Sequence, residues 1–113
     1  DWADKAANIS EEGEAMGAKG NVYYKGFQSC RSIDISTDDR VVATLAYQLF
    51  EDAELKGHSR YSRSKDWLKE NEVLFGKAQW FMMDADIKNR GYVKAEGECY
   101  KWVSERLDKG KGW

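Results

Sequence analysis

The chain has 113 residues, a length typical of a single domain. Its 20 acidic and 18 basic side chains give a net charge of −2, which argues against a nucleic-acid-binding protein because such proteins carry a basic surface. No apolar run approaches the roughly 20 residues that span a bilayer, so membrane insertion is not expected. The sequence contains 5 Trp, 6 Tyr and 4 Phe but no Pro, which favours a small helical core over a turn-rich β fold.

The first segment predicts a helix. Residues that share one helical face recur at steps of three and four: Trp2, Ala6, Ile9, Gly13 and Met16. Gly17 and Gly20 are typical of a helix end. Residues 21–33 show no helical period, so we expect an extended or irregular connector that is held to the core by its aromatic side chains and by Cys30.

The second segment gives the clearest helical pattern. Ser36 and Asp39 have the spacing of a capping box, and Asp38 and Asp39 suit the positive end of a helix dipole. Gly57 predicts the end of this helix. Between these signals lies a wide apolar stripe, which consists of Val41, Val42, Leu45, Leu49, Phe50 and Ala53.

Two further helices are expected. The third begins at Ser64 and runs to Met82, with a kink or break near Gly76. Residues 84–91 predict a turn. A final helix would place five residues on its inner face, and residues 108–113 would form a frayed tail. The five residues are Tyr92, Glu96, Cys99, Val103 and Leu107. The fold class is therefore all-α, a bundle of four to five helices in which residues 1–113 form one domain.

The chain has two cysteines, Cys30 and Cys99. It begins at Asp1 rather than Met, as expected for a trimmed chain or for a mature protein after removal of a signal peptide. In an oxidising compartment, periplasmic or secreted, the two cysteines would most simply form one disulfide. Closing a loop of about 70 residues would stabilise the fold by roughly 4 kcal/mol in the chain-entropy model. The alternative is a pair of buried free thiols in a cytosolic protein.

No catalytic or metal-binding set is visible. The only histidine, His58, lies in a basic loop without ligands at metal-binding spacing, and we expect it to be solvated. Asp84 begins a segment that resembles a calcium loop, but position six is Asn89 instead of Gly, and Glu96 falls one place beyond the bidentate position. Glu96 is the one carboxylate expected on an inner face, where it would either pair with a lysine or be partly exposed. We therefore expect no metal, no cofactor and no enzymatic activity.

A partner-binding surface is the remaining hypothesis. Carboxylates gather at both ends of the second helix, where they would attract a basic partner. They are Asp34, Asp38, Asp39, Glu51, Asp52 and Glu54. Tyr61, within "SRYSRS", is the next candidate as an aromatic anchor. The alternative for each residue is an ordinary solvated surface.

The predicted helical bundle, Cys30 within "FQSCRS", Cys99 within "GECYKWV" and the acidic surface together resemble two envelope families in overall organisation. The first comprises periplasmic immunity proteins that neutralise cell-wall-degrading effectors of type VI secretion. This resemblance implies binding to a cognate muramidase or amidase and occlusion of its active site, and a homodimer through the apolar surface of the third helix is one expected assembly. The alternative is a periplasmic acid-stress chaperone, which would unfold below about pH 3. The many aromatic residues favour the immunity reading.

Overall fold

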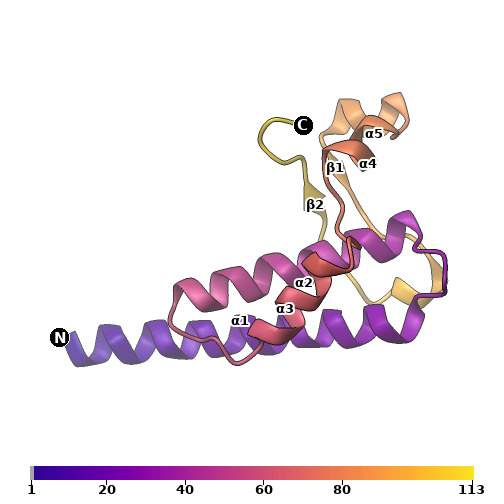
Figure 1. The fold of residues 1–113 in the computed structure, drawn as a ribbon. Helices are drawn as coiled ribbons and strands as arrows, with labels where there is room; N and C mark the ends of the chain where they lie inside the picture. Colours follow the sequence, from indigo (N-terminus) through magenta and orange to yellow (C-terminus); the bar gives the residue numbers. More distant parts are fainter. Residues whose placement is uncertain (1) are drawn as a thin grey trace.

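The fold consists of a long helical hairpin and a smaller lobe (Figure 1). The computed structural model describes the backbone of residues 2–113 and the side chains of residues 11–113. Helices α1 (Trp2–Cys30) and α2 (Thr37–Leu55) run antiparallel, and α3 (Ser62–Glu70) packs against α2. Helices α4 (Lys77–Phe81) and α5 (Ala85–Arg90) lie in the lobe with the two short strands. Five helices within residues 2–113 confirm the expected mostly helical class.

Helix α1 is longer than the sequence predicts. Gly17 and Gly20 lie inside it, and the expected connector at 21–33 is helical as far as Cys30. Both glycines face the rest of the core: a Cβ on Gly20 would lie 2.9 Å from the ring of Phe50. Glycine lowers helix stability by about 1 kcal/mol relative to alanine, but here it permits close helix packing. The prediction of a helix end was therefore wrong.

Helix α2 begins and ends where the sequence predicts. The Ser36 hydroxyl accepts a hydrogen bond from the Asp39 amide at 3.1 Å, and the Asp39 carboxylate accepts one from the Ser36 amide at 3.0 Å. Gly57, with φ of +83°, takes the left-handed conformation that ends helices without strain in glycine. The apolar stripe is buried at Val41, Val42, Leu45, Phe50 and Ala53.

The expected third helix is broken into two. Helix α3 begins two residues before Ser64 and ends at Glu70, and an irregular linker of residues 71–76 leads into α4. The break that Gly76 predicts is confirmed, since Gly76 precedes the first residue of α4. Its amide donates to the Gln79 side chain at 2.8 Å, which caps this short helix. The break turns α4 away from α3 and into the lobe.

The predicted final helix is wrong. Residues 92–107 form strand β1 (Tyr92–Val93), a 3₁₀ turn η1 (Glu98–Tyr100) and the start of strand β2 (Leu107–Asp108), which pairs antiparallel with β1. The expected turn at 84–91 contains α5, which ends at Gly91 with φ of +81°. Glu96, expected on an inner face, is exposed.

The C-terminal residues are docked and do not form a frayed tail. The indole of Trp113 lies 5.5 Å from the Phe75 ring and 5.9 Å from the Trp80 ring, measured between centroids. Lys109 donates its amide to the Gly91 carbonyl at 2.9 Å, continuing the strand pairing. The last residues therefore close the core of the lobe.

The disulfide is formed. Cys30 ends α1 and Cys99 lies in η1, with the two Cα atoms 6.0 Å apart. Trp102 covers α1 beside the disulfide, and its indole lies so close to Gly26 that a Cβ at this position would collide with it. The expected pairing is confirmed, but the bond joins the end of α1 to η1 and not an irregular connector to a final helix. Among the described helices, none is both long enough and apolar enough to span a membrane.

Candidate partner-binding surface

Asp39 is a buried residue whose carboxylate makes hydrogen bonds within the protein. Its side chain is buried, and besides capping α2 it accepts a hydrogen bond from the Tyr100 hydroxyl at 2.5 Å. Burial and then the neighbouring carboxylate raise the pKa of the Tyr100 phenol far above its ordinary value. A partner could reach Asp39 only by opening the contact between α2 and η1.

Asp38 holds the C-terminal segment against α2. Its carboxylate accepts hydrogen bonds from the amides of Gly97 at 2.9 Å and Glu96 at 3.3 Å. A Cβ on Gly97 would lie 2.9 Å from this carboxylate, so glycine permits the close approach. Asp34, in contrast, is exposed in the loop between α1 and α2. Of the three acidic residues at the start of α2, only Asp34 has a carboxylate that is free of such internal contacts.

At the other end of α2, one carboxylate is likewise bound within the protein and two are exposed. Glu54 accepts hydrogen bonds from Lys65 at 2.5 Å and from the Ser62 hydroxyl at 3.0 Å. The Lys65 bond lowers the pKa of Glu54, and the same carboxylate raises the pKa of Lys65. Glu51 and Asp52 are exposed. Because 19 helical residues span about 28 Å, the acidic residues at the two ends of α2 form two separate groups.

Tyr61 and His58 are packed into the seam between α1 and α2. The Tyr61 ring is half-buried and stacks on Phe50, with 5.4 Å between centroids. His58, expected in solvent, is also half-buried: a Cβ on Gly17 would lie 3.0 Å from its ring. Its buried Nε2 has no hydrogen-bond partner among the described residues. No group of three or more metal-ligating side chains gathers in the part of the chain that was searched.

Large apolar side chains are exposed away from the carboxylates and Tyr61 that the sequence predicts as contacts. Ile33 is 99% exposed in the loop before α2, and Phe81 and Met82 at the end of α4 are 74% and 76% exposed. The sequence places Phe81 and Met82 on the apolar stripe of the expected third helix, beyond its kink or break near Gly76. The break before α4 brings them to the surface instead. The run "WFMMD" was the available signal, because two adjacent methionines beside an aromatic residue are frequent on adaptable binding surfaces.

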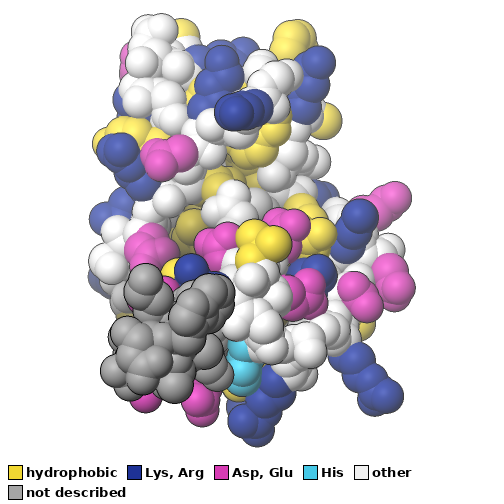
Figure 2. Space-filling model, turned by 90° about the vertical axis from the view of Figure 1, so that its left-hand side faces the viewer, with side chains coloured by type: hydrophobic (Ala, Val, Ile, Leu, Met, Phe, Trp, Pro, Cys, Tyr) yellow, Lys and Arg dark blue, Asp and Glu magenta, His cyan; other side chains and the backbone are white. Residues whose placement is uncertain are grey.

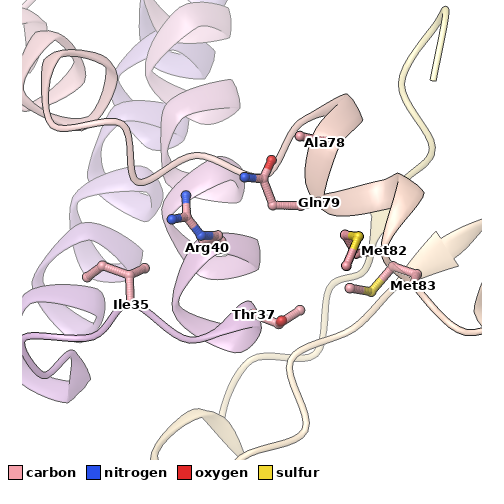
Figure 3. Close-up of a pocket in the computed structure, with 7 residues that line it drawn as sticks. All are labelled: Ile35, Thr37, Arg40, Ala78, Gln79, Met82 and Met83. Carbon is pink, nitrogen blue, oxygen red and sulfur yellow. The ribbon is translucent and has the colours of Figure 1, made fainter.

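An open pocket lies between the start of α2 and α4, with a volume of about 280 Å³ (Figure 3). The Arg40 guanidinium and the Gln79 amide lie on the side next to the 71–76 linker, and the two methionines lie on the opposite side. Its walls combine polar and apolar side chains from both elements: Ile35, Thr37, Arg40, Ala78, Gln79, Met82 and Met83. We call this pocket together with Ile33 and Asp34, which directly precede Ile35 in the chain, the pocket face.

Surface charge differs between the lobe and the helical hairpin. Figure 2 shows Lys and Arg side chains both at the top, over the lobe, and at the lower end, whereas most acidic side chains lie in the middle and lower part. In the lobe, the guanidinium groups of Arg90 and Arg106 lie 4.6 and 4.4 Å from the centroid of the Tyr92 ring. Arg106 also pairs with Asp108 at 3.0 Å. Arg90 and Arg106 thus contact aromatic or acidic side chains, whereas the described residues give the Arg40 guanidinium in the pocket no such neighbour.

Comparisons with known proteins give no relative: no family model matches the chain, and no curated protein or solved structure matches it. The class that the structure itself defines is a small, disulfide-linked, mostly helical protein with an exposed apolar face beside an open pocket.

Proposed function

We propose that this protein is a binding protein without catalytic activity, an inhibitor that occludes a secreted cell-wall hydrolase of the muramidase or amidase type. The observation that carries the proposal is the pocket face. Ile33 is almost fully exposed two residues before the pocket residue Ile35, and Met82 is exposed on the opposite wall. Exposed side chains of this kind favour contact with another protein.

The disulfide supports a location in an oxidising compartment. A bond between Cys30 and Cys99 is compatible with an oxidising, extracellular environment, since cytosolic thiols are normally kept reduced. Cell-wall hydrolases act in such an environment. We propose the periplasm as the place where the inhibitor and its target meet.

The exposed carboxylates contribute to encounter more than to anchoring. Asp34 lies on the pocket face next to Ile33, and Glu51 and Asp52 are exposed near the far end of α2. Exposed charges of this kind accelerate association with a basic partner and make its rate sensitive to salt. Asp38, Asp39 and Glu54 already bind groups of this chain, so we propose Ile33 as the central contact and Asp34 as the charged residue beside it that guides encounter.

A paired binding experiment tests this function. The oxidised protein and two variants, Ile33→Asp and Leu55→Asp, are used to capture proteins from an envelope extract. Leu55 is a matched control because it is 86% exposed at the opposite end of α2. We expect a hydrolase that the parent and Leu55→Asp retain and that Ile33→Asp loses, because a central apolar contact contributes about 2 kcal/mol or more.

The captured hydrolase must then be inhibited. In a peptidoglycan-release assay, one equivalent of the parent should abolish activity and Ile33→Asp should not. A hydrolase that stays fully active with excess parent protein, or equal inhibition by Ile33→Asp and the parent, would refute the proposal.

The chaperone alternative has one structural observation in its favour. Two carboxylates hold the C-terminal segment to α2: Asp38 accepts a hydrogen bond from the Gly97 amide, and Asp39 accepts one from the Tyr100 hydroxyl. If the protein is an acid-stress chaperone, tertiary circular dichroism is lost below about pH 3 and client proteins are protected from aggregation. A chain that unfolds there without protecting clients removes this alternative.

A further inference from the structure

We propose that the pocket between α2 and α4 binds the C-terminal end of a polypeptide, with the terminal carboxylate on Arg40 and an apolar last side chain against Met82 and Met83. This inference goes beyond the inhibitor function and holds whether or not the partner is a hydrolase. It assigns a specific ligand chemistry to the polar and apolar walls of one pocket.

Arg40 is a fixed cation that lacks a carboxylate. Its Nη1 donates to the backbone carbonyls of Glu72 at 2.9 Å and Leu74 at 3.2 Å, which hold the guanidinium against the linker. None of the ion pairs among the described side chains includes Arg40. Both bonds use Nη1, so Nε and Nη2 have no acceptor among the described residues. A guanidinium held in this way suits a carboxylate, which can accept two hydrogen bonds from it.

Two further polar groups line the pocket beside this cation. The Gln79 side chain accepts a hydrogen bond from the Gly76 amide at 2.8 Å through Oε1, which leaves its NH₂ group as a donor. Figure 3 shows this amide on the same side of the pocket as the Arg40 guanidinium. The Thr37 hydroxyl lies across from Gln79. Arg40 and Gln79 thus present donors on one side of the pocket, with the Thr37 hydroxyl across from them, and an anionic, acceptor-rich group suits such a lining.

The opposite wall is apolar and adaptable. Met82 and Met83 present flexible thioether side chains, which accommodate Leu, Ile or Met more readily than a rigid wall would. A volume of about 280 Å³ is at the lower limit for ligand pockets, so it suits one or two residues and is too small for a long acyl chain. The open side lets the rest of a polypeptide leave the pocket.

Methionine methyl NMR tests the assignment on the intact, oxidised protein. The chain has three methionines: Met82 and Met83 line the pocket, and Met16 lies on α1 as an internal reference. The probes are acetyl-Gly-Ser-Leu with a free carboxylate, the same peptide as its C-terminal amide, and decanoate. We expect the free acid to shift the Met82 and Met83 signals saturably, with the Met16 signal unchanged and the amide at least about ten-fold weaker.

Two adjacent substitutions provide the matched variants. Met82→Asp places a negative charge in the pocket and should weaken binding of the acid by about ten-fold or more, read from Met83. Phe81→Asp changes a neighbour of equal exposure that does not line the pocket, and binding should be unchanged. Neither side chain is buried, so both variants are expected to fold.

The proposal is overturned if the amide binds as tightly as the acid, or if neither methyl signal moves at peptide concentrations up to about 10 mM. Decanoate binding as tightly as the peptide acid would assign the pocket to a lipid instead. Equal loss in Phe81→Asp and Met82→Asp would show that the pocket is not the site. Ile33→Asp should bind the peptide acid as tightly as the parent does. A failure of peptide binding can therefore be told apart from a failure of the proposed inhibitor function.

Discussion

Thr44 positions the linker that carries the pocket. Its side chain is buried on α2, and its Oγ1 donates to the Arg40 carbonyl at 2.7 Å and accepts a hydrogen bond from the Phe75 amide at 2.7 Å. Thr44→Val keeps the shape and the helix preference of the residue but removes the acceptor. The buried Phe75 amide is then left without its partner.

The magnitude follows from two opposing effects. A buried amide without a partner lowers the free energy of unfolding by about 1–3 kcal/mol. The additional buried methyl group of valine raises it by about 0.8 kcal/mol. The Arg40 carbonyl loses little, because a helical carbonyl at this position also accepts the backbone amide four residues later. We therefore expect Thr44→Val to lower the free energy of unfolding by about 0.2–2 kcal/mol.

Urea unfolding gives the free energy, and amide hydrogen exchange identifies its cause. Thr44→Ser is the control: it keeps the hydroxyl and loses one buried methyl group, about 0.8 kcal/mol. Phe75 should lose protection in Thr44→Val by more than the global change in stability, and it should keep its protection in Thr44→Ser. Equal protection of Phe75 in the two variants would refute this role of Thr44.

Three further predictions concern the packing of α1, α2 and the C-terminal segment. Tyr100→Phe removes the hydrogen bond to the buried Asp39 carboxylate and should cost about 1.5–3 kcal/mol in urea unfolding; an unchanged midpoint would contradict the contact. Reducing Cys30–Cys99 should cost roughly 4 kcal/mol, measured by unfolding with and without reductant, and a loss below about 1 kcal/mol would show that loop closure contributes little. Gly20→Ala should lower the melting temperature although alanine favours helices, because its Cβ would lie 2.9 Å from Phe50; a higher melting temperature would show that α1 can move away.

The sequence by itself determined the features that depend on neighbouring residues. Ser36 and Asp39 cap α2 through bonds across three positions, and Gly57 ends it with a backbone conformation that glycine adopts freely. The break near Gly76 has the same local origin. The pairing of Cys30 with Cys99 followed because the chain has only two cysteines.

Only the tertiary structure decided the features in which distant groups compete with local preference. Gly17 and Gly20 would end an isolated helix, but contact with α2 and with the residues that follow it favours their helical conformation within α1. Residues 92–107 have helical spacing, but they form the strand pairing and donate hydrogen bonds to the carboxylates of Asp38 and Asp39 instead. The pocket has the same origin, because Arg40 and Met82 meet only after the linker folds back onto α2. The periodicity of a sequence shows which residues could share one face of a helix. Whether that helix forms depends on burial and hydrogen bonding over the whole chain.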